Sequence, residues 1–168
     1  MKALVPLDGS DLALSVLPNV RRLAELAPGL EVHLFTVIDP KSVHGRSDRP
    51  AGELTSTIPG SKFASALAPA PRVVESHGEA LERAHLDANE VLEAISHGEL
   101  DGVATSFGVV FSSNIAEAIA ESANELSADL IIMATHGRSG ISHLLTGSVT
   151  EAVIRNSGKP VLKYLPDT

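Results

Sequence analysis

Short apolar runs alternate along this chain with segments in which apolar residues recur every three or four positions. The runs have the length and β-branched content of buried strands, and the spaced segments are typical of amphipathic helices. The predicted strands are 3–7, 31–39, 102–111, 128–135 and 161–165. The predicted helices are about 11–27, 81–97, 115–126 and 149–155. This alternation predicts an α/β fold, a parallel doubly wound sheet with helices on both faces.

Several residues mark the expected ends and irregularities of these elements. Ser10 is placed to cap the first helix, and Pro18 inside that helix predicts a kink or a lost hydrogen bond. Ser112 or Ser113 is expected to cap the third helix. Gly108 predicts a bulge in the strand before it.

The segment at about 40–76 interrupts the pattern, because it is rich in Pro, Gly and Ser and has only weak apolar clusters. We interpret it as an irregular insertion in a single domain that spans 1–168. A lid over a ligand and a solvated surface excursion are both open for this segment.

The connection between the fourth strand and the last helix is unusually rich in small and polar residues. Gly137, Gly140 and Gly147 allow the backbone to approach a ligand closely with its N–H groups turned inward, as in an anion-binding nest. Ser148 opens the helix, where free N–H groups favour a phosphate, and Arg138 could reach a terminal phosphate. The alternative is a glycine-rich turn followed by an ordinary helix cap.

The first strand ends in an acid, Asp8, rather than in a phosphate-binding glycine motif. Neither G-x-x-x-x-G-K-[ST] nor a G-x-G-x-x-G turn after the first strand occurs. A carboxylate there would repel phosphate but accept a hydrogen bond from an exocyclic amine or a ribose hydroxyl. Asp8 could equally bond its own backbone in a turn. If it binds a ligand, the base lies toward the first strand and the phosphates toward the last helix.

Composition and charge limit the classes of protein to which this chain can belong. The 168 residues are 43% hydrophobic and 3% aromatic, which is enough for one aliphatic core. The formal charge of −8 argues against general nucleic-acid binding, which requires a basic surface. Cysteine is absent, and no apolar run has the length of a signal peptide core or a membrane span. A soluble cytoplasmic protein is expected.

Five stretches together resemble one known family. They are ALVPLDGS, FTVID, ADLIIMATHGRSG, LLTGSVTEAVI and KPVL. The resemblance is to the universal stress protein family, over about 1–39 and 78–168. It implies a Rossmann-like sheet of strand order 3-2-1-4-5, ATP or another adenine nucleotide as ligand, and a homodimer through the last strand, at 160–165. In the interaction-module alternative, this last strand would be the working surface without any nucleotide.

The resemblance also assigns site residues. The expected contacts are Asp8 and Val37 with adenine, Pro6 and Leu7 along its edge, Met133 and Ala134 with the ribose, and Gly137, Gly147, Ser148 and Val149 with the phosphates. The family pattern is G-x2-G-x9-G-[ST], and Ala134 stands where its first glycine is expected. Because a strand end favours negative φ, we expect the alanine to be tolerated with a small loss of affinity.

The implied activity is regulatory, in a stress response, with ATP as a conformational ligand and slow or no hydrolysis. A Mg²⁺ or Mn²⁺ ion bridging the phosphates would offset their charge. A weak ATPase is the enzyme alternative, with His136 and His143 as candidate bases or metal ligands, but no ordered set of nucleophile, base and orienting group is recognisable.

Overall fold

The structure is a computed structural model that describes residues 1–45, 75–135 and 148–166. Its strands are β1 (Lys2–Pro6), β2 (Glu31–Ile38), β3 (Ala104–Phe111), β4 (Leu130–Ala134) and β5 (Val161–Tyr164). Its helices are α1 (Asp11–Leu14), α2 (Leu17–Leu26), α3 (His77–His97), α4 (Ile115–Glu125) and α5 (Ser148–Asn156), with a 3₁₀ turn, η1, at Pro40–Ser42. Each predicted strand is present, and so are the helices predicted at 81–97, 115–126 and 149–155, with ends shifted by a few residues.

The five strands form one sheet of order β3-β2-β1-β4-β5, and all neighbouring strands are parallel. This confirms the predicted fold class and strand order. The order reverses direction at β1, since the chain first builds outward through β2 and β3 and then returns to place β4 on the other side of β1. In such sheets a crevice opens at this switch point, beyond the C-terminal strand ends.

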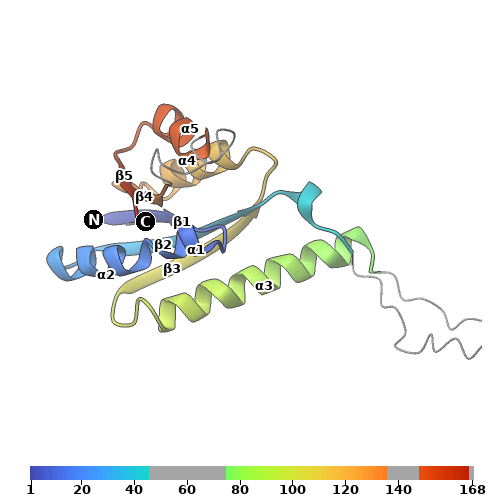
Figure 1. The fold of residues 1–168 in the computed structure, drawn as a ribbon, viewed down its shortest axis with the longest axis horizontal. Coiled ribbons are helices and arrows are strands. Elements are labelled where there is room, and N and C mark those ends of the chain that lie inside the picture. The colour runs from blue at the N-terminus through green and yellow to red at the C-terminus, as the bar shows by residue number, and fades with distance from the viewer. Residues whose placement is uncertain (46–74, 136–147, 167–168) are drawn as a thin grey trace, which may run out of the picture.

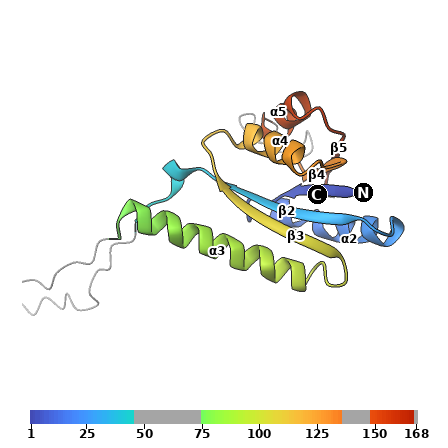
Figure 2. The same cartoon turned by 180° about the vertical axis from the view of Figure 1, so that it is seen from behind.

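Helices cover both faces of the sheet (Figures 1 and 2). One face packs against α1, α2 and α3, with Val5, Leu34 and Ile132 fully or almost fully buried in that layer. The other face packs against α4 and α5, with Leu4 and Ile131 at its centre. Because both faces are covered, the side chains of the central strands are apolar on both faces of the sheet. The unbroken apolar runs in the sequence indicated this.

The first predicted helix is two helices. Ser10 caps α1, accepting a hydrogen bond from the N–H of Ala13 at 3.1 Å, as predicted. The chain then bends at Ser15, and Pro18 stands in the first turn of α2 rather than in mid-helix. A proline lacks the N–H that a first-turn residue does not need, so the chain tolerates it there. The single long helix was therefore a wrong prediction.

Gly45 and Glu75, the described residues on either side of 46–74, lie close together near the start of α3. Ser76 and Glu79 form a capping box there. Arg83 binds the carboxylate of Glu75 with two nitrogens, at 2.8 and 3.1 Å. A Cβ on Gly45 would overlap the Glu75 carbonyl oxygen, so the two chain segments touch at this point. Of the segment predicted as an insertion, about 40–76, the structure describes only the two ends, which hold η1 and the cap of α3; the insertion itself and its lid and surface alternatives lie outside the described residues.

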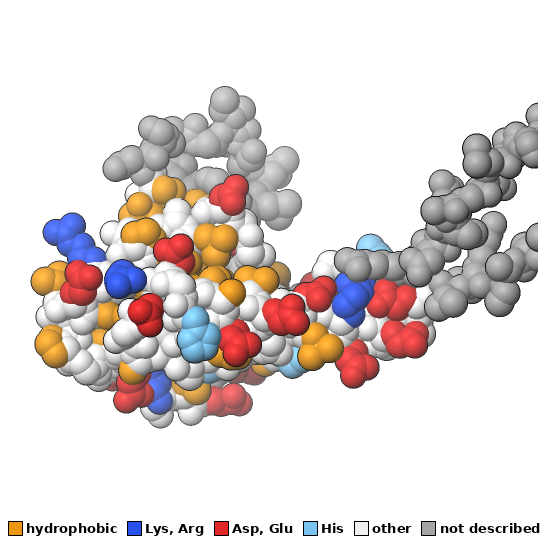
Figure 3. Space-filling view, turned by 90° about the horizontal axis from the view of Figure 1, so that it is seen from below, with side chains coloured by type: hydrophobic (Ala, Val, Ile, Leu, Met, Phe, Trp, Pro, Cys, Tyr) orange, Lys and Arg blue, Asp and Glu red, His pale blue; other side chains and the backbone are white. Residues whose placement is uncertain are grey.

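The outer surface of α3 is strongly acidic (Figure 3). Exposed carboxylates along it are Glu79, Glu82, Asp87, Glu90 and Glu93. Such a surface repels a nucleic-acid backbone. Within the described ranges, no helix has the length and apolar content needed to cross a membrane.

Two local predictions were wrong. The cap of α4 is Asn114, whose side chain accepts from the N–H of Glu117 at 3.4 Å, and not Ser112 or Ser113. Ser112 directly follows β3, and its N–H donates to the Ile38 carbonyl of β2 at 3.0 Å.

Gly108 forms no bulge, since the β2–β3 register continues through it without interruption. A Cβ at Gly108 would lie 3.3 Å from Nε2 of His33, so the glycine leaves room for that ring. His33 Nδ1 lies 2.8 Å from the Ser106 hydroxyl, and partial burial lowers the pKa of the imidazole.

Candidate functional site

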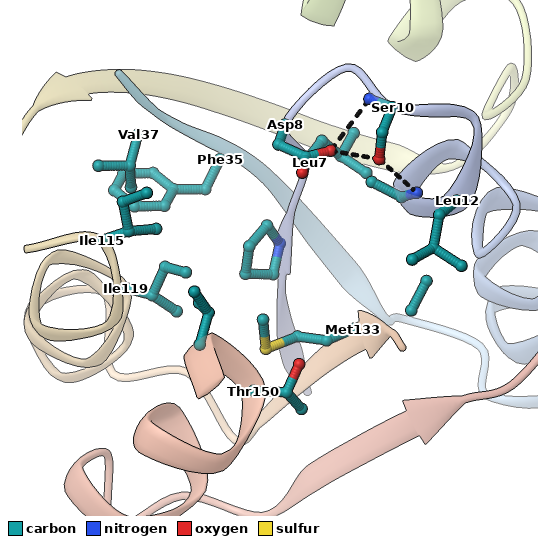
Figure 4. A pocket seen from close by; sticks show the side chains of 14 residues that line it. Leu7, Asp8, Ser10, Leu12, Phe35, Val37, Ile115, Ile119, Met133 and Thr150 are labelled. Atoms are coloured by element: carbon teal, nitrogen blue, oxygen red, sulfur yellow. Dashed lines mark hydrogen bonds between the residues drawn. The ribbon is translucent and has the colours of Figure 1, made fainter. Parts of the chain in front are cut away.

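A cavity of about 290 Å³ opens at the switch point, beyond the ends of β1 and β4 (Figure 4). Its volume is at the lower end of the range for small-molecule pockets. It is lined by Pro6, Leu7, Asp8, Ser10, Leu12, Ala13, Phe35, Val37, Ile115, Ile119, Met133, Ala134, Val149 and Thr150. These residues come from three strands, the turn after β1 and the N-terminal parts of three helices, so the cavity depends on the whole sheet topology.

Among the residues that the structure describes, Asp8 is the only charged one that lines the cavity. One carboxylate oxygen accepts from the backbone N–H of Ser10 at 3.0 Å and from its hydroxyl at 2.6 Å. Gly9 between them has φ of +77°, which closes the turn. The turn role considered for Asp8 is therefore realised by Oδ1. Among the described residues Oδ2 has no hydrogen-bond partner, so the carboxylate keeps an acceptor for a ligand.

The end of β2 presents unpaired backbone groups to the cavity. The Leu7 N–H donates to the Phe35 carbonyl at 2.8 Å, which shows that odd-numbered residues of β2 turn their backbone groups toward β1. Val37 therefore also turns its N–H and C=O toward the side of β2 on which β1 lies. β1 ends at Pro6, before it reaches this position. Among the described residues neither group of Val37 has a hydrogen-bond partner. One donor and one acceptor thus stand side by side at the cavity wall.

The first turn of α5 forms the opposite side of the cavity. Val149 and Thr150 line it, next to Met133 and Ala134 at the end of β4. Figure 4 shows Thr150 and Met133 on the far side of the cavity from Asp8. The N–H groups of a helix's first turn have no intrahelical partner and carry the positive end of the helix dipole. This side of the cavity is therefore suited to an anion.

The remaining wall is apolar. Phe35 and Val37 from β2 and Ile115 and Ile119 from α4 make one continuous surface, on which a flat ring could pack. The lining residues that the structure describes include no His, Lys or Cys, and the same part of the chain contains no group of three metal-ligating side chains. The described lining thus combines an apolar slot, a donor–acceptor pair, one carboxylate and a helix N-terminus, a combination suited to binding a ligand with a flat ring and an anionic end.

Seven residues predicted for the site share this cavity. They are Pro6, Leu7, Asp8, Val37, Met133, Ala134 and Val149. Gly137, Arg138 and Gly147 lie outside the described residues, as do His136 and His143, and for Ser148 the structure describes only its place at the start of α5. The roles of all these residues toward a nucleotide stay predictions.

The sequence reasoning missed half of the wall. Phe35 lies two residues before Val37 and shares its side of β2, so the two-residue period of a strand could have identified it. Thr150 follows Val149 in the same helix turn. Ile115 and Ile119 were recognised only as the apolar stripe of a helix, because nothing local indicates that the start of α4 reaches the end of β2.

The chain is similar in sequence and fold to known universal stress proteins. The chain is 29% identical to Universal stress protein MJ0531 of Methanocaldococcus jannaschii over 161 residues, which cover 96% of this chain and 79% of the relative. Its fold matches the solved structure of the protein MJ0577 with a TM-score of 0.69, at 26% identity, over 99% of this chain and 96% of that one.

Two further neighbours were solved with adenine nucleotides. One is a universal stress protein in complex with cAMP, with a TM-score of 0.57 at 19% identity, covering 99% of this chain and 98% of that one. The other is the universal stress protein from Archaeoglobus fulgidus in complex with dAMP, with a TM-score of 0.54 at 21% identity, covering 97% and 96%. A family model described as the universal stress protein family matches residues 1–163, and the chain therefore belongs to that family.

Proposed function

We propose that this protein binds ATP, or another adenine nucleotide, in the cavity between β1, β4 and α5 and uses it as a conformational ligand in a cytoplasmic stress response. One observation carries the proposal: backbone groups of β2 without a hydrogen-bond partner among the described residues lie at one side of the cavity, and the N-terminus of α5 lies at the other. A nucleotide has a planar base and an anionic tail, and each end meets the group that suits it.

The base end is supported by the backbone of Val37 and by Asp8. Adenine offers an acceptor, N1, next to a donor, the N6 amine, and the N–H and C=O of one residue complement them. Asp8 Oδ2 can accept from an amine or a ribose hydroxyl, and Phe35 and Ile115 provide an apolar surface for the ring.

The phosphate end is supported by the first turn of α5. Backbone N–H groups there can bind phosphate oxygens without any net positive charge. The protein carries a formal charge of −8, so a Mg²⁺ or Mn²⁺ ion held by the phosphates would reduce the repulsion. The relatives solved with cAMP and dAMP support the class of ligand, although their bound nucleotides are not triphosphates.

Nucleotide binding has a direct test. Purified protein is denatured with acid, and released adenine is sought by its ultraviolet absorbance. ATP is then titrated into nucleotide-free protein by calorimetry, with and without Mg²⁺, and AMP and cAMP are compared. We expect saturable binding at one site per chain, because the cavity takes one base. Failure to bind any adenine nucleotide would leave a dimeric interaction module as the function. A single-turnover assay over hours, against free ATP, decides whether there is hydrolysis.

We also propose a homodimer through β5, at 160–165. Within the described ranges, β5 pairs only with β4 and its other edge has no strand beside it, and Leu162 and Leu165 are 48% and 53% exposed. Open edge strands are templates for pairing with another chain. The charge of Lys163 is offset by an ion pair with Glu151 of α5, which also lowers the pKa of that carboxyl.

Leu162→Glu is expected to convert the dimer to a monomer, because two carboxylates would face each other across the paired strands. Light scattering at micromolar protein measures the mass. Leu86→Glu is the matched control, since Leu86 is 57% exposed on α3, far from β5, and should leave the dimer intact. A wild-type protein of monomer mass would contradict the assignment.

A further inference from the structure

A side chain replaces a backbone donor at the point where β1 leaves the sheet. The last ladder bond between β1 and β2 runs from the Leu7 N–H to the Phe35 carbonyl, at 2.8 Å. In a parallel ladder the next bond would run from the Val37 N–H back to the Leu7 carbonyl. Instead, the hydroxyl of Thr36 donates to that carbonyl, at 3.0 Å.

This exchange leaves the Val37 N–H free. Leu7 is buried, so its carbonyl needs a partner, and the Thr36 hydroxyl supplies one from the neighbouring position. The Val37 N–H, which would otherwise be drawn into the sheet, has no partner among the described residues and stands at the cavity wall. In this structure the Leu7 carbonyl thus accepts from the hydroxyl, and the β1–β2 ladder stops before the cavity.

We propose that Thr36 is a positioning residue that keeps the Val37 N–H available to the base and thereby sets the preference for adenine. The inference rests on the proposed function. Adenine presents an acceptor at N1 beside its N6 donor, whereas hypoxanthine presents a donor at N1 beside an acceptor at O6. The direction of β2 fixes the order of the Val37 N–H and C=O, so the two bases are not equivalent in one pose.

Thr36→Val tests the inference, because valine has the shape of threonine without the donor. The Leu7 carbonyl then takes the Val37 N–H, and the base loses one hydrogen bond. We expect ATP to bind roughly fivefold to tenfold more weakly, and the preference for ATP over ITP to shrink by a similar factor. Thr36→Ser retains the hydroxyl and should restore both values.

A matched control makes the same substitution elsewhere. Thr105 lies on β3, on the face that packs against α3, and its hydroxyl is hydrogen-bonded to Ser96. Thr105→Val should change the melting temperature without changing nucleotide preference. The inference would be overturned if the Thr36→Val variant bound ATP and ITP with the same two affinities as the wild-type protein.

Amide exchange in the nucleotide-free protein gives a readout that does not depend on binding. The Val37 amide of the wild-type protein should exchange rapidly with solvent deuterium, and the Thr36→Val variant should slow it by bringing it into the ladder. A protected Val37 amide in the wild type would overturn the inference even if the variant failed to fold. If wild-type protein binds no nucleotide, the proposed function fails, and with it the role of Thr36 in base preference.

Discussion

Replacing Val149 by glutamate is expected to weaken ATP binding by about 100-fold or more, while binding of adenosine changes little. Val149 lines the cavity in the first turn of α5, where we place the phosphates. A carboxylate at this position would lie within a few ångströms of them. At an effective dielectric constant of about 20, two like charges 4 Å apart repel by about 4 kcal/mol, so partial screening still leaves a loss of that order of affinity.

The variant should fold, because an acidic residue suits this part of a helix. Val149 is only partly buried, and a negative charge in the first turn of a helix is stabilised by the helix dipole, by about 0.3–1 kcal/mol. The lost apolar packing of the valine is therefore partly offset. A thermal melt without ligand would verify that the protein remains folded.

Val149→Gln is the matched control, since it has the size of the glutamate variant without the charge. Calorimetric titration of ATP and adenosine into both variants separates charge from shape. A large loss for ATP in the glutamate variant alone supports phosphates at α5. Equal losses for both ligands in both variants would mean that position 149 contacts the base or ribose, and the proposed orientation of the nucleotide would be wrong.

Much of the fold follows from features that are local in the sequence. An apolar run such as the one before Ala134 indicates a strand covered on both faces, and Ser10 caps a helix wherever the chain turns into one. Strand order is not a local feature, because nothing in the apolar pattern of β1 indicates that β2 and β4 are its neighbours in the sheet. The order came from resemblance to a family.

The local errors have a common cause. Ser112, Ser113 and Asn114 are three adjacent residues that can each cap a helix, and the choice depends on where β3 releases the chain. The sequence predicted a bulge at Gly108, whereas in the structure the glycine makes room for the ring of His33. In both cases the deciding contact comes from β2, more than seventy residues away in the sequence.

The candidate site divides in the same way. Asp8 and Val149 were predicted because strand ends and helix starts are visible in the sequence. Ile115 and Ile119 were not, because α4 reaches the cavity only through the folded sheet. Thr36 also could not be identified from the sequence, because the role of its hydroxyl depends on where β1 stops pairing with β2.

Truncation of Leu4 to alanine is expected to lower the free energy of unfolding by about 3 kcal/mol, the middle of the range for buried leucines. Leu4 has no solvent exposure and lies in β1, the central strand, beneath α4 and α5. Its neighbours Ile131 and Val153 come from β4 and α5 and are themselves fully buried, so they have little freedom to close around the lost methyl groups.

Urea unfolding followed by far-ultraviolet circular dichroism measures the change, and the melting temperature should fall by roughly 10 °C for a chain of this size. Leu26→Ala is the matched control, because Leu26 ends α2 and is 75% exposed, so its loss should cost less than about 0.5 kcal/mol. A similar cost for the two variants would mean that Leu4 is not enclosed by α4 and α5. Because the same layer supports Phe35 and Met133 at the cavity, that outcome would also remove the rigid floor on which the proposed nucleotide site rests.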